Sequence, residues 1–238
     1  NIPDAEKINK KAIDWIKNQK GQFFLWLHYM DVHEPYAPKD YENKKELLYL
    51  ITKYRDFPNM ITESEKEKLI TLYDLEIKYT DKEIANLIKN LEEENCLKNS
   101  IIILTSDHGE EFFDHGGWGH GQSLYNELIH VPLLIKFPSQ RYRGKWVEAN
   151  VSLVDLLPTV LDFYQIENRR EIDGVSLLPS IQTQGGGERK IVSVLKYTEG
   201  DAASAKIEKV SLIYRNFKLI YNYPYSRDVL DFYAEFPP

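Results

Sequence analysis

Residues 101–109 read IIILTSDHG, an apolar run that passes directly into polar residues. Ile101–Leu104 is apolar without alternation, which is typical of a parallel strand covered on both faces. In parallel α/β sheets, sites form where loops leave the carboxyl ends of strands. Asp107 offers an anionic oxygen and His108 an imidazole nitrogen, and Gly109 would let the backbone turn sharply so that both face one point. Such a mixed set suits Mn²⁺ or Zn²⁺ better than a cation that prefers only oxygen.

Taken alone, this short motif favours a simpler interpretation, in which Asp107 caps the next helix and His108 lies on the surface. A second motif shifts the balance. The apolar run Phe23–Leu27 predicts another buried strand, and YMDVHEPY follows it at residues 29–36. If the two strands are parallel in one sheet, Asp31 and His33 emerge at the same edge as Asp107 and His108. His33 alone is as readily a loop histidine bonded to backbone.

A glycine-rich segment, DHGGWGHG at residues 114–121, follows the Asp107/His108 motif. Its glycines allow a tight loop that could approach an anion closely, and they leave His120 with little steric cover. His115 is more readily a loop hydrogen-bonder than a site residue. His28 and His130 adjoin predicted strands and are expected to be structural.

The flanking sequence alternates predicted helices and strands, which indicates an α/β sheet. Helical spacing of apolar residues predicts helices over 4–19 and 63–94, and Thr62 with Glu65 forms a plausible capping box before the second. Residues 131–137 predict a third strand, and residues 152–164 a helix in which Pro158 suggests a kink.

The C-terminal region predicts a small antiparallel sheet from short strands at 191–195, 210–214 and 217–221, with a turn at 215–216. The run QGGGE at 184–188 is the best linker candidate. We therefore expect an α/β domain over 1–183, a linker over 184–189, and the start of a small C-terminal subdomain over 190–238.

Composition excludes several classes of protein. The 238 residues carry 30 Lys+Arg against 37 Asp+Glu, a formal charge of −7, which argues against a nucleic-acid partner. The hydrophobic share of 42% can supply a sizeable core. The longest uncharged apolar run, 23–30, is too short to span a bilayer. A single cysteine, Cys96, excludes an intrachain disulfide and a multi-cysteine metal site, and we expect it to be an inert thiol.

Several ordered blocks resemble the sulfatase family. These are FFLWLHYMDVHEPY at 23–36, TSDHGE at 105–110, DHG at 114–116, GHG at 119–121, YNE at 125–127, VPL at 131–133, VDLLPTVL at 154–161, DGVSL at 173–177 and FKLI at 217–220. The resemblance implies an alkaline-phosphatase-like α/β/α sandwich, present in part, with a small C-terminal antiparallel β subdomain. It also implies hydrolysis of sulfate esters, with relatives that act on phosphate and phosphonate esters.

By that resemblance, Asp107 and His108 would be metal ligands, and His33 and His120 would contact the transferred anionic group. One divalent metal ion is expected, Ca²⁺, Mn²⁺ or Zn²⁺. Many sulfatases have Asn where His108 stands and Lys where His120 stands. These departures favour Mn²⁺ or Zn²⁺ over Ca²⁺, and they add weight to phosphodiester or phosphonate substrates.

The family's nucleophile motif, Cys/Ser-x-Pro-x-Arg with its formylglycine, does not occur in this sequence, nor does the family's first acidic metal-ligand pair. We expect the chain to be the C-terminal portion of a sulfatase, inactive alone, with the missing N-terminal half as its partner. The expected substrate is a small-molecule or carbohydrate sulfate ester. The alternatives are a metal-dependent phosphodiesterase or phosphonate monoester hydrolase, or a non-catalytic anion-binding module.

Overall fold

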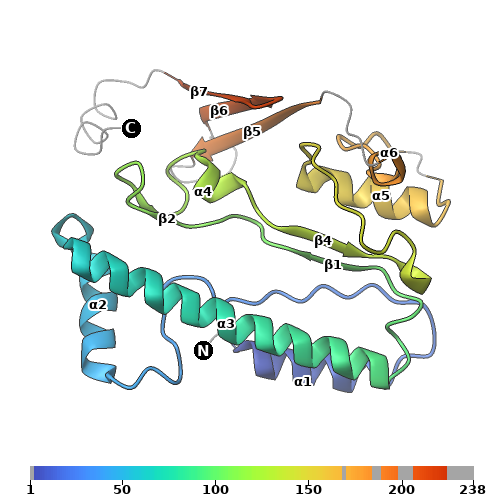
Figure 1. The fold of residues 1–238 in the computed structure, drawn as a ribbon, viewed down its shortest axis with the longest axis horizontal. Coiled ribbons are helices and arrows are strands. Elements are labelled where there is room, and N and C mark those ends of the chain that lie inside the picture. The colour runs from blue at the N-terminus through green and yellow to red at the C-terminus, as the bar shows by residue number, and fades with distance from the viewer. Residues whose placement is uncertain (1–2, 168–169, 184–188, 198–205, 224–238) are drawn as a thin grey trace. The chain divides into compact units, whose positions relative to one another are not determined.

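The computed structural model describes residues 3–167, 170–183, 189–197 and 206–223. The chain divides into two compact units, Asn1–Asn99 and Ser100–Pro238 (Figure 1). Within the described residues, no helix combines the length and the apolar character needed to cross a membrane.

The first unit is helical. Its elements are α1 (Ala5–Ile16), α2 (Lys44–Asp56), the 3₁₀ turn η1 (Pro58–Met60) and the long α3 (Glu63–Glu93). Helices α1 and α3 lie side by side (Figure 1) and bury Ile13, Ile16 and Leu87 between them. Burial of such side chains contributes about 1.5–3 kcal/mol each relative to exposure, so this contact holds the two helices together. The helices predicted over 4–19 and 63–94 are confirmed.

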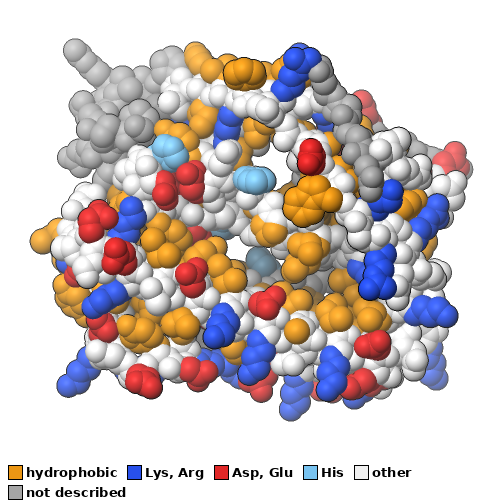
Figure 2. Space-filling model, viewed as in Figure 1, with side chains coloured by type: hydrophobic (Ala, Val, Ile, Leu, Met, Phe, Trp, Pro, Cys, Tyr) orange, Lys and Arg blue, Asp and Glu red, His pale blue; other side chains and the backbone are white. Residues whose placement is uncertain are grey.

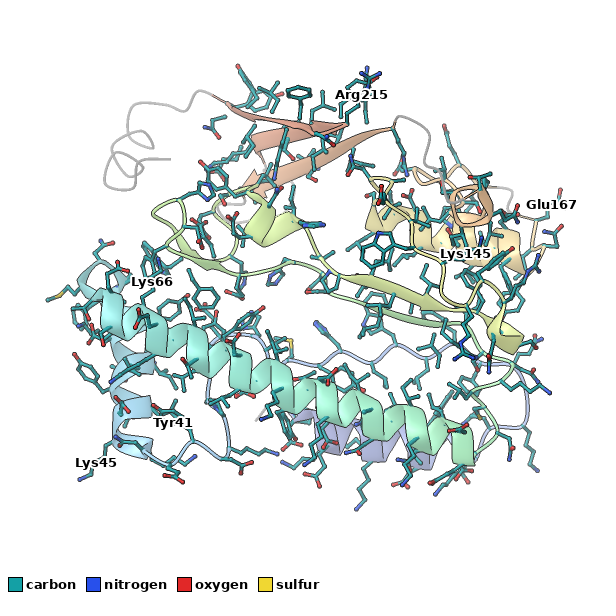
Figure 3. All side chains as sticks on the ribbon, in the orientation of Figure 1. Tyr41, Lys45, Lys66, Lys145, Glu167 and Arg215 are labelled. Atoms are coloured by element: carbon teal, nitrogen blue, oxygen red, sulfur yellow. The ribbon has the colours of Figure 1, made fainter. Side chains whose placement is uncertain are left out.

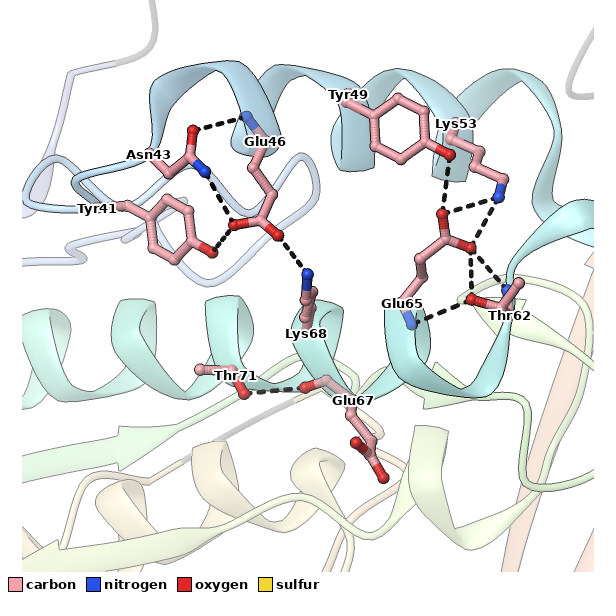
Figure 4. A network of polar contacts seen from close by, with 10 residues as sticks. All are labelled: Tyr41, Asn43, Glu46, Tyr49, Lys53, Thr62, Glu65, Glu67, Lys68 and Thr71. Carbon is pink, nitrogen blue, oxygen red and sulfur yellow. Dashed lines mark hydrogen bonds and ion pairs between the residues drawn. The ribbon is translucent and has the colours of Figure 1, made fainter.

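Polar contacts join α2 to α3 (Figure 4). Thr62 and Glu65 form the predicted capping box, in which the Thr62 side chain accepts from the Glu65 backbone N–H and the Glu65 carboxylate from that of Thr62. Glu65 also accepts from Lys53 Nζ at 2.7 Å. A second ion pair joins Lys68 of α3 to Glu46 of α2. The start of α3 is therefore fixed both locally and by its neighbour.

The buried strand predicted over Phe23–Leu27 is wrong. Residues 21–30 form no regular strand, and none of the described residues 3–99 forms one. Leu25 and Leu27 pack against the α1–α3 core, whereas Phe24 is 83% exposed and Trp26 is 75% exposed. A strand needs neighbouring backbone to bond its N–H and C=O groups. The first unit offers no such ladder, so only one face of this segment is covered.

The second unit contains β1 (Ile102–Thr105) and β4 (Leu133–Lys136), which confirm two predicted strands. Their pairing is antiparallel, with Ile103 opposite Ile135, so this neighbour of β1 is not the parallel strand that its apolar sequence predicts. A parallel neighbour needs a crossover, usually through a helix that returns the chain to the starting end. Residues 106–132 contain only a two-stranded ladder, β2 (Glu111–Phe112) with β3 (Trp118–Gly119), and the one-turn helix α4 (Asn126–Ile129).

The core of the second unit forms around Phe137 and the short helix α6 (Leu178–Thr183). The 3₁₀ turns η2 (Pro138–Gln140) and η3 (Leu153–Asp155) precede α5 (Leu156–Phe163), which confirms the helix predicted over 152–164. Pro158 lies in the first turn of α5, where its missing N–H would have no intrahelical partner, so the helix accommodates it.

The C-terminal strands β5 (Lys190–Tyr197), β6 (Lys206–Tyr214) and β7 (Phe217–Asn222) form the predicted antiparallel sheet in the order β5-β6-β7. Arg215, labelled in Figure 3, makes the β6–β7 turn in the left-handed region with φ 53°. Apolar side chains, orange in Figure 2, lie at the surface over this sheet, and Phe217 is 78% exposed. The predicted linker run 184–188 lies outside the described residues.

Candidate functional site

Asp107 and His108 follow the end of β1, and their side chains lie close to each other. The His108 Nε2 atom is 3.9 Å from Asp107 Oδ1, and the Asp107 side chain is 66% exposed. His108 Nδ1 lies 2.9 Å from the Gly109 carbonyl oxygen. Because a carbonyl only accepts, Nδ1 donates its proton to that oxygen, and Nε2 lies on the ring edge beside the carboxylate. This oriented nitrogen and exposed carboxylate fit a divalent cation that takes mixed ligands.

Gly109 is held by close packing. Its N–H donates to the Leu128 carbonyl oxygen at 2.8 Å. A Cβ atom at Gly109 would lie 2.0 Å from the Glu127 carbonyl oxygen. Its backbone is outside the left-handed region, so the sharp turn expected of this glycine is not the reason for it. Only glycine lets the segment after His108 approach α4 so closely.

The loop after β2 brings His120 to His108. The two rings stack with centroids 4.2 Å apart and planes 26° apart. His120 Nδ1 lies 2.9 Å from Glu110 Oε1, and the Glu110 side chain is only 4% exposed. The carboxylate therefore orients His120 with Nε2 on the opposite edge of the ring. Gly119 and Gly121, on either side of His120, have φ of 66° and 92°, which glycine adopts without steric cost.

Glu110 was not among the residues singled out from the sequence. Glu110 stands two residues after His108 and ten before His120. This separation does not predict a contact with His120, because the contact depends on how the loop closes. The only signal in the sequence is chemical, because Glu110 is one of the acids near His120 that could accept from its ring N–H.

The remaining histidines of the second unit are placed differently. His115 stacks on Tyr125 with centroids 3.7 Å apart, and its Nδ1 lies 3.6 Å from Glu127 Oε1. His130 is exposed. In the first unit His28 is exposed as well, so the structural role expected for these two does not come from burial.

His33 belongs to the first unit, in the loop that follows residues 21–30. Its N–H donates to the Met30 carbonyl oxygen at 3.2 Å, and its Nδ1 lies 2.7 Å from the Glu34 carbonyl oxygen. Asp31, the expected partner of His33, instead accepts from the Ala5 N–H at 3.2 Å and so binds the start of α1.

A buried acid on α3 lies behind this loop. Glu76 is only 7% exposed, and burial raises its pKa to about 7, with the negative charge of Asp31 adding to the effect. Burial also raises the pKa of Tyr29 to about 12. Tyr29 donates to Asn9 Oδ1 at 2.6 Å, which joins the loop to α1. Polar contacts to α1 therefore hold the loop around His33 in place within the first unit.

Comparison with known proteins places these motifs in a family context. The family model described as Sulfatase matches residues 3–166, and the model described as N-sulphoglucosamine sulphohydrolase, C-terminal, matches residues 114–235. Arylsulfatase K of Bos taurus is 36% identical over 183 residues, which cover 77% of this chain and 30% of the relative. N-acetylglucosamine-6-O-sulfatase of Bacteroides thetaiotaomicron is 32% identical over 145 residues, which cover 60% of this chain and 26% of the relative.

Among solved structures, the phosphonate monoester hydrolase of Agrobacterium radiobacter shares the fold, with a TM-score of 0.69 at 19% identity. The match covers 93% of this chain and 55% of that chain. The present chain thus spans about a third or less of the curated relatives above and about half of this structural neighbour.

Proposed function

Because the chain belongs to the sulfatase family, we propose that it supplies part of an active site that hydrolyses sulfate esters. In this proposal Asp107 and His108 bind one divalent cation, and His33 and His120 contact the transferred anionic group. The observation that carries it is the stacked pair of imidazoles beside an exposed carboxylate, with each Nδ1 engaged by an oxygen. This arrangement leaves both Nε2 edges oriented by the protein.

The cation, when bound, would neutralise charge on the ester oxygens and activate a hydroxyl nucleophile. An imidazole in its first shell favours Mn²⁺ or Zn²⁺ over Ca²⁺, which prefers oxygen ligands. His120 would place its Nε2 edge toward an oxygen of the anion while Glu110 holds the opposite edge. If the His120 ring is protonated, donation of its Nε2 proton to the leaving alcohol contributes about 10²–10⁴ in rate.

We further propose that the nucleophile, a formylglycine, comes from a segment outside these 238 residues, since no Cys/Ser-x-Pro-x-Arg motif is present. The missing N-terminal half of the same protein is the proposed partner that supplies it, together with further acidic metal ligands. The name of the Bacteroides thetaiotaomicron relative supports a carbohydrate sulfate as the substrate.

Metal titration tests the ligand assignment directly. Mn²⁺ binding to the purified chain is measured by electron paramagnetic resonance for the wild type, Asp107→Ala and His108→Ala. We expect each variant to weaken binding about tenfold or more, as is typical when a metal shell is disturbed. His130→Ala, at an exposed histidine of the same unit, is the control and should bind as the wild type does. Equal affinity in all four proteins would refute the assignment.

Turnover tests the role of His120. In the protein joined to its nucleophile segment, His120→Ala should lower kcat for an aryl sulfate by about 10²-fold or more. Unchanged turnover would remove His120 from the proposed site. The 238-residue chain alone should give no multiple turnover with the same substrate, and measurable multiple turnover would refute the need for the second segment.

A second candidate is hydrolysis of phosphonate or phosphodiester bonds, favoured by histidine at positions 108 and 120. Comparing kcat/KM for aryl sulfate and aryl phosphonate in the joined protein separates the two. A higher value for the phosphonate would replace the sulfatase proposal. Sulfate binding without any turnover of either ester would instead indicate a non-catalytic anion-binding module.

A further inference from the structure

Glu111 is a carboxylate buried inside the loop that carries His120. It lies on β2 and is only 1% exposed. Its Oε1 accepts from the N–H groups of His115 and Gly117 at 3.2 and 3.1 Å. Its Oε2 accepts from Gln122 Nε2 at 3.5 Å and Ser123 Oγ at 3.3 Å. The loop on both sides of His120 therefore converges on a single side chain.

The backbone approaches this carboxylate without room for a side chain. A Cβ atom at Gly117 would lie 2.8 Å from Glu111 Oε2 and 3.0 Å from Oε1. In the β2–β3 ladder Glu111 lies opposite Gly119, the residue before His120. A displacement of the Glu111 side chain would thus be passed to His120 through the adjacent peptide.

The C-terminal sheet supplies a positive charge to the same region. Lys209 of β6 donates from Nζ to the Gln122 carbonyl oxygen at 2.7 Å. Burial lowers the pKa of this ammonium group, and the charges of Glu208 and Glu111 oppose that effect. Lys218 of β7 donates to Asn126 Oδ1 at 2.8 Å. The segment after His120 is therefore held by the sheet as well as by Glu111.

We propose that Glu111 is a positioning residue of the candidate site, whose carboxylate closes the loop over residues 112–123 and thereby sets the place of His120 beside His108. Lys209 holds the far end of the same loop. This positioning of His120 by Glu111 does not require sulfatase activity. Only the role of His120 toward an anion rests on the proposed function.

The chemistry explains why an acid is required. The four groups that contact the Glu111 oxygens can all donate, and an ionised carboxylate offers acceptors only. The isosteric change Glu111→Gln keeps the shape but replaces one oxygen with an NH₂ group. That group would face N–H or NH₂ donors, so hydrogen bonds would be lost without any loss of packing volume.

Nuclear magnetic resonance of the chain tests the proposal without any turnover. We expect Glu111→Gln to speed amide exchange at His115 and Gly117 about tenfold, since hydrogen bonds to a charged group are weakened. The ring signals of His120 and His108 should shift in the same variant. Asp155→Asn is the matched control, because Asp155 is fully buried in the same unit and accepts from the Ser152 and Val175 N–H groups.

The control should lower stability while leaving the His120 and His108 signals in place. Unchanged signals in Glu111→Gln, or equal shifts in Asp155→Asn, would overturn the proposal. Should Glu111→Gln fail to fold, Ser123→Ala removes one donor from Oε2 and should shift the His120 signals in the same direction by a smaller amount; no shift would also overturn it. A failure of the sulfatase proposal would affect none of these signals, so the two failures are distinguishable.

Discussion

Replacing Gly109 with alanine should destabilise the second unit strongly, because the added methyl group would clash with the backbone of α4. The added Cβ would lie 2.0 Å from the Glu127 carbonyl oxygen, whereas ordinary contact begins at 3.4 Å. The two segments would have to separate by about 1.4 Å, which would also break the hydrogen bond from the Gly109 N–H to Leu128. Overpacking and the lost bond together cost about 2–4 kcal/mol.

The measurement is urea unfolding followed by tryptophan fluorescence, since each unit contains two of the four tryptophans. For a slope of about 2 kcal/mol per molar urea, the midpoint should fall by about 1–2 M. Two other glycine variants separate the effect of a steric clash from the effect of backbone conformation. Gly144 has open space but φ of 70°, so Gly144→Ala should cost about 1 kcal/mol. Gly21 has neither constraint, and Gly21→Ala should stay within about 0.5 kcal/mol.

The order of destabilisation is therefore Gly109→Ala, then Gly144→Ala, then Gly21→Ala. If Gly109→Ala were no worse than Gly144→Ala, the close approach to α4 would not be what requires glycine. Backbone conformation would then be the better explanation.

Three further outcomes are expected. Lys53 lowers the pKa of Glu65 to about 2. The ionised Glu65 carboxylate therefore stabilises the first unit above about pH 4.5, and this stabilisation is lost as the pH falls toward 2. In urea titrations, Glu65→Gln should abolish this pH dependence. Burial raises the pKa of Glu76 to about 7. The free energy of unfolding should therefore decline as the pH rises from about 4.5 to 7 and level off above. Glu76→Gln should remove that decline, and an unchanged decline in this variant would show that Glu76 is not its cause. Arg215 has φ of 53°, so Arg215→Asn should raise the melting temperature by a few degrees, about 0.5–1 kcal/mol, whereas a lower one would show that the turn needs arginine.

Local chemistry was readable from the sequence where both partners lie within a few residues. The capping box of Thr62 and Glu65 spans one turn, so its spacing alone specifies the contact. The antiparallel pair of β6 and β7 follows in the same way from two short apolar runs and the break after Tyr214. In each case the hydrogen bonds that stabilise the feature join residues of one short stretch of chain.

Features that depend on how segments of the chain pack against one another were not readable. Phe23–Leu27 has the composition of a buried strand, but its state depends on a ladder that the first unit does not provide. Gly109 was expected to allow a sharp turn, yet what requires glycine at this position is the close approach of the Glu127 carbonyl oxygen of α4. Glu110 and Glu111 are identical neighbours in sequence, and only the closed loop shows that one contacts His120 and the other fills the loop.

The contacts of Glu111 also bear on how this part of the molecule forms. Its four donors lie 4 to 12 residues away along the chain. Loop-closure entropy grows only slowly with length, and contacts of such low sequence separation form early in folding. The surroundings of His120 can therefore nucleate within a single short stretch of polypeptide, without waiting for long-range docking. The hydrogen bonds from Lys209 and Lys218, whose partners lie 87 and 92 residues away, would then form on a loop that has already closed.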